Sequence, residues 1–247
     1  MCTLLILFRP ENKWPLILGG NRDEMINRNW LPPDKYWGKD IIGGKDQVAG
    51  GTWLGLNKNG IVATILNRSN SLGVDNKKES RGNLVIDVLK KNNMNDIISY
   101  LSSLNATNWR SFNLFIANNE KAIWVKNDNT KKLKLNYIDP GQHFIDSHDI
   151  NSLDSHRFRY NLNNYNKLLP PEPEKNLWTS WKNFLSSKNF PDNNPLAAIN
   201  IIKKNNYGTL CTNFIALPNS NQIKLKPIYL FNDNTNLHSN YYTVKTW

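Results

Sequence analysis

The chain has few cysteines, and their scarcity excludes two common ways of stabilising a small protein. Its 247 residues include only Cys2 and Cys211, which are too few for a disulfide framework. No spacing of Cys and His is typical of a structural zinc site. We therefore expect both thiols to be reduced and the protein to hold no metal and no other cofactor.

Long apolar runs are also absent. No stretch approaches the ~20 residues that cross a bilayer. The apolar run at residues 4–8 is too short for a signal sequence and follows no basic segment. We expect a cytoplasmic protein without a membrane span.

Clusters of positive charge are missing, although the formal net charge is +11. The basic residues are scattered, their longest runs are pairs such as Lys77-Lys78, and no nucleic-acid-binding motif accompanies them. We favour a generally basic surface over a nucleic-acid partner.

A hydrophobic content of 39% with nine residues each of Trp, Tyr and Phe is typical of a packed globule. We expect one domain over residues 1–247, and the sequence leaves its oligomeric state open.

The beginning of the chain predicts an antiparallel hairpin. Apolar runs at residues 3–8 and 15–20 flank a polar break that contains Pro10, Glu11 and Asn12. A turn centred near Glu11 and Asn12 makes the numbers of paired residues sum to about 23 or 24. Cys2 would then lie at the sheet end that also carries the tetrad Asn21-Arg22-Asp23-Glu24.

This juxtaposition suggests nucleophilic chemistry. A small second residue favours removal of Met1, which would leave a thiol and a free α-amine on Cys2. The amine has a reference pKa of ~8, close to the ~8.5 of a thiol, so it can serve as the base. Arg22 would favour the thiolate, and Asp23 could hold the amine. The alternative is that Cys2 only opens a buried strand and that the tetrad is a solvated strand end.

A second hairpin is predicted after Gly50-Gly51. The dipeptide Asn59-Gly60 separates apolar runs at residues 52–56 and 61–66, which is a strong hairpin signal. A turn centred on Asn59-Gly60 makes the residue numbers of each cross-strand pair sum to about 117, which places Asn67 opposite Gly50. A side-chain amide beside glycines that admit a substrate is suitable for stabilising an oxyanion. The alternative is a polar residue that ends a strand.

The rest of the chain predicts strands and helices in the order β, αα, β, ααα, β, which fits two sheets covered by helices. The expected helices are residues 84–91, 96–104 with Asn95 as N-cap, 157–168, 177–186 and 196–203; the expected strands are 112–117, 122–126, 133–138, 209–217, 223–231 and 241–246. Residues 25–44 read as an aromatic loop. Residues 143–155 have few regular signals, and their His, Ser and Asp have no spacing diagnostic of a catalytic triad or a metal site.

Several of these segments together resemble the NRDE-motif family, the family of transport and Golgi organisation protein 2. The resemblance rests on Met1-Cys2, Gly20 to Glu24, Gly50 to Gly55, Asn67, Arg81-Gly82, Phe112-Asn113-Leu114 and Tyr207-Gly208-Thr209. This family is similar to N-terminal nucleophile hydrolases such as choloylglycine hydrolase and penicillin V acylase. The resemblance implies an α+β fold, a four-layer αββα sandwich with antiparallel sheets, and amide-bond chemistry.

The resemblance also implies roles for individual residues. It makes Cys2, Arg22, Asp23, Asn67 and Asn113 the candidate catalytic residues, and Asn21, Gly50, Gly51 and Arg81 the candidate substrate-binding residues. Asn67 matches an oxyanion donor of choloylglycine hydrolases. Asn113 is either a second site residue or a satisfied core amide, and an Arg at a helix start, as Arg81 is, is more often structural. The chain departs from the family at Leu210, where members often have Arg. Cys211 next to it is either a core residue or a second thiol near the site.

The leading hypothesis is a cysteine amidohydrolase that cleaves a small-molecule, non-peptide carboxamide through a thioester on Cys2. The rival hypothesis is a non-catalytic carrier or chaperone for haem, acyl-CoA or another lipid, a role that the eukaryotic relatives imply. An aromatic-lined cleft would serve either function. The sequence leaves the substrate open.

Overall fold

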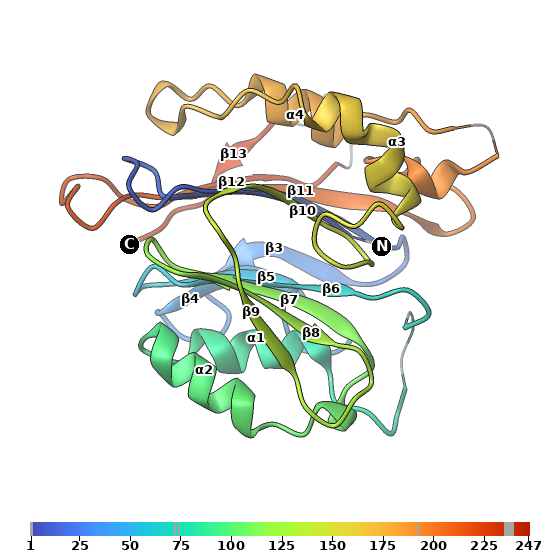
Figure 1. Ribbon diagram of the computed structural model, residues 1–247, viewed down its shortest axis with the longest axis horizontal. Coiled ribbons are helices and arrows are strands. Elements are labelled where there is room, and N and C mark those ends of the chain that lie inside the picture. The colour runs from blue at the N-terminus through green and yellow to red at the C-terminus, as the bar shows by residue number, and fades with distance from the viewer. Residues whose placement is uncertain (1, 72, 74, 192, 235–239) are drawn as a thin grey trace.

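A computed structural model describes residues 2–71, 73, 75–191, 193–234 and 240–247. Two antiparallel sheets lie face to face, and helices cover the outer face of each (Figure 1). From one outer surface to the other, the layers are helices α3 and α4, the first sheet, the second sheet, and helices α1 and α2 (Figure 1). The expected α+β fold with four layers is confirmed.

The first sheet, which we call sheet A, carries the N-terminal hairpin at its centre. Its strand order is β10-β1-β2-β11-β12-β13. In the hairpin, Thr3 pairs with Asn21 and Phe8 with Leu16, so the predicted sum of 24 is confirmed. The strands are β1 (Thr3–Phe8), β2 (Leu16–Met25), β10 (Gly141–Ile145), β11 (Tyr207–Leu217), β12 (Ile228–Asn232) and β13 (Tyr242–Thr243).

The second sheet, sheet B, contains seven strands among the described residues, in chain order across the sheet from β3 to β9. The strands are β3 (Trp30–Asp34), β4 (Ile41–Asp46), β5 (Leu54–Asn57), β6 (Val62–Asn67), β7 (Phe112–Ala117), β8 (Ala122–Asn127) and β9 (Lys134–Tyr137). The second predicted hairpin forms between β5 and β6, but Leu54 pairs with Thr64, which gives a sum of 118. The expected register, with Asn67 opposite Gly50, is therefore wrong by one residue.

Four α-helices are described, and most of them match the prediction. They are α1 (Arg81–Leu89), α2 (Met94–Ser103), α3 (His156–Tyr165) and α4 (Thr179–Ser186), with short 3₁₀ turns η1 (Ala106–Asn108), η2 (Pro173–Lys175) and η3 (Pro195–Ala197). The N-cap of α2 is Asn93, whose side chain accepts a hydrogen bond from the backbone of Asp96, so the prediction of Asn95 is wrong. Asn93 satisfies a backbone donor that Asn95, inside the helix, does not.

Three segments differ from the prediction because tertiary pairing overrides local signals. Residues 25–44, expected as a loop, contain β3 and the start of β4; β3 lies at a sheet edge, where prolines are tolerated. Residues 143–155 contribute the end of β10, whose polar side chains hid its pairing with β1. The expected helix at residues 196–203 is only the turn η3, because the backbone of Ile201 bonds with Thr209.

The late strands are also shorter than expected. Strand β12 begins at Ile228 rather than residue 223, since Gln222 and Leu225 form turns. Strand β13 is limited to Tyr242–Thr243.

The core has three parts, and they define the two faces of each sheet. One cluster fills the space between the sheets and includes Leu4, Leu18, Val62, Leu66 and Cys211. A second lies between sheet B and helices α1 and α2, and a third between sheet A and helices α3 and α4. Because side chains alternate along a strand, successive residues of the tetrad lie on opposite faces of sheet A.

No helix in the described part of the chain is long and apolar enough to cross a membrane.

Candidate functional site

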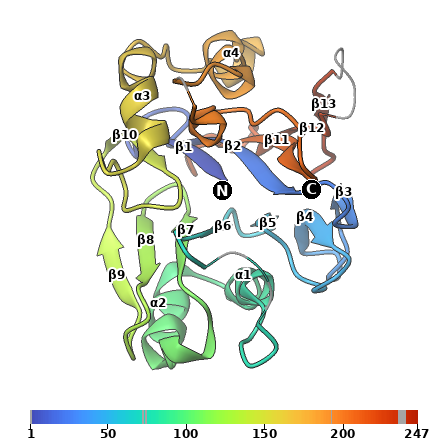
Figure 2. The same ribbon diagram turned by 90° about the vertical axis from the view of Figure 1, so that its right-hand side faces the viewer.

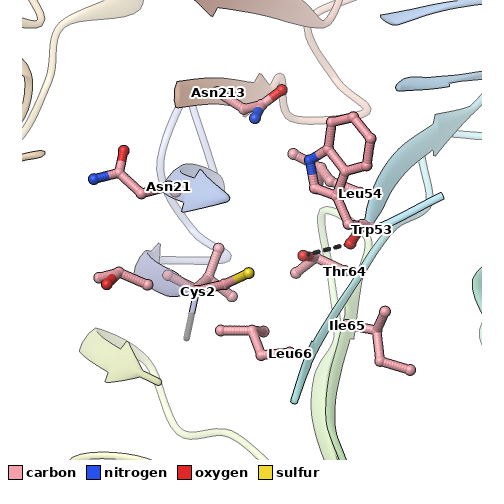
Figure 3. A pocket seen from close by; sticks show the side chains of 11 residues that line it. Cys2, Asn21, Trp53, Leu54, Thr64, Ile65, Leu66 and Asn213 are labelled. Carbon is pink, nitrogen blue, oxygen red and sulfur yellow. Dashed lines mark hydrogen bonds between the residues drawn. The ribbon is translucent and has the colours of Figure 1, made fainter. Parts of the chain in front are cut away.

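Cys2 lies at the start of β1, where the two sheets face each other. Its Sγ points into a small cavity whose opposite wall comes from sheet B, including Trp53 and Thr64 (Figure 3). The cavity has a volume of about 20 Å³, which is room for about one water molecule. The thiol also lies 3.9 Å from the backbone oxygen of Asp23.

The environment of Cys2 acts on its pKa in opposite directions. Burial is the largest effect and raises the pKa of the thiol above its ordinary value. The positive charges of the chain's N-terminus and of Arg22 oppose this shift. The thiol therefore needs a nearby base to reach its reactive form near neutral pH.

Arg22 is held between the sheets in an aromatic cage. Its guanidinium lies 4.2 Å from the ring centre of Trp53 and 6.0 Å from that of Trp30. It also forms an ion pair of 3.1 Å with Asp46, which in turn pairs with Arg28 at 2.6 Å. The cation is 4% exposed, so its charge acts on the Cys2 end of the cavity with little screening by water.

Trp53 can occupy this position because β4 provides space for its ring. A Cβ atom on Gly44 would lie 2.2 Å from the ring of Trp53, so any other residue at position 44 would displace the indole. The ring of Trp53 also meets that of Trp30 edge to face, with 5.8 Å between centres. The aromatic residues of the segment once expected as a loop thus help to wall the site.

Asp23 lies on the opposite face of sheet A from Arg22, beneath helix α3. Its carboxylate accepts hydrogen bonds from Arg157 at 2.9 Å and from Thr209 at 2.6 Å. Arg157 also donates to the hydroxyl of Thr3, the residue next to Cys2. The side chains of Arg157 and Asp23 are 2% and 0% exposed, so this is a buried ion pair that ties helix α3 to the strand ends of the site.

Asn21 is likewise directed away from the cavity (Figure 3). Its amide nitrogen donates to the backbone oxygens of Leu185 and Ile199, and its oxygen accepts from the hydroxyl of Thr212 at 2.7 Å. The structure thus places the tetrad residues in two settings. Arg22 shares the cavity side with Cys2, whereas Asn21 and Asp23 anchor the strand end from behind.

Neither Asn67 nor the glycine pair is among the residues that line the cavity at Cys2. Asn67 ends β6, is half-buried, and by alternation lies on the same side of the strand as Ile65, whose side chain packs towards helix α1. A Cβ atom on Gly51 would lie 2.3 Å from the backbone of Gly82. The close approach of α1 to this loop gives Gly51 a packing reason to be glycine, and Gly50 has a positive φ of 76°.

Asn113 is completely buried and its amide is satisfied. The nitrogen donates to the backbone oxygens of Asp146 and His148, and the oxygen accepts from Arg68 at 2.7 Å. These bonds favour the interpretation of Asn113 as a satisfied core amide. Arg81 donates to the backbone oxygens of Ser71 and Ser111. Burial lowers the pKa of Arg81 to about 10.

Sequence reasoning missed the polar groups that line the cavity beside Cys2. Asn213 of β11 lines it, and its oxygen accepts from Tyr229 at 3.0 Å. The indole nitrogen of Trp53 and one terminal nitrogen of Arg22 are buried without a hydrogen-bond partner. The nitrogen edge of Trp53 is turned toward the side of the cavity that carries Cys2 (Figure 3). Unpaired buried donors are costly, and of these two residues it is Trp53 that lines the cavity.

Cys211 is the second thiol, and it is a core residue. It is completely buried between the sheets, and burial raises its pKa to about 12. A thiol in this state is a poor nucleophile.

A separate polar network joins the loop after β10 to the N-terminus of helix α3. Nδ1 of His148 lies 3.2 Å from the carboxylate of Asp146, which also accepts from the hydroxyl of Ser155. The bond with Asp146 raises the pKa of His148. Burial favours a higher pKa for Asp146, but its bonds with His148 and Ser155 outweigh burial and lower it.

This network predicts a pH dependence of stability. Because the folded-state pKa of His148 is raised, its contribution is fully present below the unfolded value of about 6.5 and is lost as the pH rises through the folded value. We expect the free energy of unfolding, measured in urea, to fall more between about pH 6 and pH 9 in the wild type than in His148→Gln. His156→Gln, at an exposed position, is the control and should keep the wild-type slope. Equal slopes in all three proteins would contradict the assignment.

No group of three His, Cys, Asp or Glu side chains that could hold a metal ion occurs in the part of the chain that the structure describes.

Comparison with solved structures shows what the fold resembles. The N-acylethanolamine-hydrolyzing acid amidase ortholog of Caenorhabditis elegans is similar with a TM-score of 0.58 at 12% identity, over 87% of this chain and 92% of that one. A Cys-to-Ala mutant of the conjugated bile acid hydrolase of Clostridium perfringens is similar with a TM-score of 0.54 at 14% identity, over 98% of this chain and 92% of that one. At these identities the likeness is one of fold.

Comparison of sequences leads to one family. The Transport and Golgi organization protein 2 homologs of Bos taurus and Homo sapiens are 32% and 34% identical to this chain over 128 residues. Each match covers 47% of this chain and 45% of the relative, so it spans less than half the length of these relatives. The family described as Transport and Golgi organisation 2 matches residues 1–227. The chain therefore belongs to the Transport and Golgi organisation 2 family.

Proposed function

We propose that the protein is a hydrolase of amide bonds that uses Cys2 as its nucleophile. The observation that carries the proposal is the position of the Cys2 thiol, which faces a cavity opposite the unpaired indole N–H of Trp53. A nucleophile and a free donor across a small space are what acyl transfer requires. The fold shared with an acid amidase and a bile acid hydrolase supports the same reaction class.

The proposed reaction begins with removal of Met1, which frees the α-amine of Cys2. The Sγ of Cys2 attacks the carbonyl carbon while its proton moves to this amine. The C–N bond then breaks, and the amine returns the proton to the leaving group, which departs as a neutral amine. Water attacks the resulting thioester, the carboxylic acid leaves, and the thiol is restored.

Arg22 and Asp23 have different tasks in this reaction. Arg22 lies on the Cys2 side of the sheet, where its charge lowers the pKa of the thiol. Asp23 bonds with Arg157 and Thr209 behind the sheet, and its backbone oxygen lies 3.9 Å from the thiol. We assign Asp23 the role of holding the end of β2 in place beside Cys2.

We assign the oxyanion to Trp53 rather than to Asn67. Trp53 lines the cavity and its indole nitrogen lacks a hydrogen-bond partner, whereas Asn67 is not among the residues that line the cavity. A cavity of about 20 Å³ admits a carbonyl oxygen but little more. The rest of the substrate would therefore lie outside the cavity, along the strand ends that carry Cys2.

The experiment that tests this proposal is a search for the acyl-enzyme. The processed protein is incubated with a set of small amides, and amine release and the intact mass are followed. We expect turnover of at least one amide and a thioester that hydroxylamine removes, both lost in Cys2→Ala. Saturable, submicromolar binding of haem or acyl-CoA by wild type and Cys2→Ala alike, with no amide turnover, would instead support a carrier.

Removing the unpaired donor should slow acylation without harming the fold. For Trp53→Phe, we expect the rate of Cys2 acylation by 4-nitrophenyl acetate to fall by roughly 10²–10³-fold, the effect of losing one oxyanion donor. Any fall in the thermal midpoint should reflect lost packing around the ring, because the indole nitrogen forms no hydrogen bond in the fold. The rate is measured from the release of 4-nitrophenolate.

Trp109→Phe is the matched control for this variant. The indole nitrogen of Trp109 is also buried without a partner, but Trp109 packs in the cluster between sheet B and the helices α1 and α2. Its replacement should leave acylation unchanged. An equal rate in Trp53→Phe and wild type would show that Trp53 does not bind the oxyanion.

A further inference from the structure

A second and much larger cavity lies on the outer face of sheet A. It has a volume of about 520 Å³, within the range of small-molecule sites. Its walls come from helix α4, from the segment before β11, and from β11 and β12. Helix α4 lies on the side of sheet A that faces away from sheet B (Figures 1 and 2), so this cavity is separate from the one at Cys2.

The charged residues that line this cavity are all lysines. Its lining includes Lys182, Lys188 and Lys203, and none of the described residues that line it is Asp or Glu. Lys182 lies 4.6 Å from the ring centre of Tyr241, and burial lowers the pKa of Lys182. An anion placed in this cavity would be attracted by these three positive charges.

The lining also includes neutral polar groups and apolar groups. Helix α4 contributes the side chains of Asn183 and Ser186 to the lining, both of which can donate hydrogen bonds to an oxyanion. Ile201, Ile202 and Tyr241 provide apolar and aromatic surface. A ligand that carries an anionic head on an apolar or aromatic body would contact both kinds of surface.

The lining of the cavity includes two residues that bond with the tetrad on the outer face of sheet A. Thr209 and Thr212 both line the cavity. The hydroxyl of Thr209 donates to Asp23 at 2.6 Å, and that of Thr212 donates to Asn21 at 2.7 Å. Asn21 and Asp23, which hold the end of β2 beside Cys2, thus each bond directly with a residue that lines this second cavity.

We propose that this cavity binds a small organic anion, with a phosphate or carboxylate against its lysines and an apolar or aromatic group against Tyr241 and Ile202. The site is distinct from the Cys2 cavity and does not depend on the proposed hydrolase reaction. Its occupant would contact the hydroxyls that anchor Asn21 and Asp23.

Three probes with the same ring test the proposal. 2-Naphthyl phosphate and 2-naphthoate are anions at neutral pH, whereas 2-naphthol is neutral. We expect at least one of the two anions to bind saturably with a Kd below about 1 mM, and 2-naphthol to bind at least tenfold more weakly. The stronger of the two anions identifies the head group, and its affinity should fall as the salt concentration rises. Binding is measured by calorimetry.

Matched variants locate the binding. Lys188→Gln/Lys203→Gln should weaken anion binding at least tenfold. Lys131→Gln/Lys132→Gln, which makes the same change of charge at exposed positions before β9, should leave it unchanged. Cys2→Ala should bind as the wild type does, whether or not the protein is a hydrolase.

Any of the following results would overturn the proposal. They are the absence of saturable binding of either anion, an equal affinity for 2-naphthol, and an equal loss of affinity in the two lysine double variants. Loss of binding in Cys2→Ala would place the anion at the small cavity and would also contradict it.

Discussion

The Arg157→Met variant should lose about 3–5 kcal/mol of unfolding free energy, the usual cost of leaving one member of a buried ion pair without its partner. The carboxylate of Asp23 is 0% exposed and pairs with Arg157 at 2.9 Å. In the variant this carboxylate keeps its bond with Thr209 but loses the positive charge of Arg157. For a chain of this size the thermal midpoint should fall by roughly 6–20 °C. Urea unfolding measures the free energy.

Controls separate the ion pair from a general effect of altering helix α3. Arg159 is exposed on the same helix, and Arg159→Met should change the free energy of unfolding by no more than about 0.5 kcal/mol. Adding Asp23→Asn to Arg157→Met should restore part of the loss, because the buried negative charge that Arg157 balanced is then removed as well. If Arg157→Met and Arg159→Met unfold at the same urea concentration, the pair does not stabilise the fold as described.

Retention of Met1 should remove most of the reactivity of Cys2. With Met1 present, the nitrogen of Cys2 belongs to an amide, which cannot accept a proton near neutral pH, while the thiol itself is unchanged. Burial raises the pKa of this thiol, so few molecules carry the thiolate without a base. We expect the acylation rate of Cys2 to fall by roughly 10²–10⁴-fold, the usual contribution of a positioned base.

The parts of the site that were predicted depend on local signals. The polar break with Pro10 and Glu11 between two apolar runs fixed the hairpin and its register, and the register placed Cys2 beside the tetrad. Turn chemistry likewise located the β5–β6 hairpin, although its register was wrong by one residue. Such signals act within about twenty residues, and they were sufficient for the order of strands and for most helices.

The partners of the tetrad were not predicted, because they come from distant segments. Arg157 is 134 residues from Asp23 in the sequence, and their contact requires both the strand alternation and the position of helix α3. One signal was available. Arg157 lies in the first turn of its helix, where the helix dipole disfavours a cation, so an acidic partner could have been expected.

The strands at the sheet edges were also missed by the sequence-based prediction. The Pro32-Pro33 pair and the polar Gln142 and His143 read as loop, yet β3 and β10 lie at sheet edges, where these residues are tolerated. The consequence for function was that Trp30 was assigned to a loop when it packs against Trp53 beside Arg22. The unpaired indole donor of Trp53 was beyond sequence reasoning, since a missing hydrogen bond is visible only in three dimensions.

The most direct test of the account compares two forms of the protein that differ only in Met1. Both are released from a cleavable N-terminal fusion, so that one begins at Met1 and the other at Cys2, and the rate of Cys2 acylation by 4-nitrophenyl acetate is measured across the neutral pH range. The account predicts that the form beginning at Cys2 reacts at least ~100-fold faster near pH 7.5 and that its rate levels off above the pKa of an α-amine, about 8. Equal rates in the two forms would contradict the claim that the α-amine of Cys2 is the catalytic base.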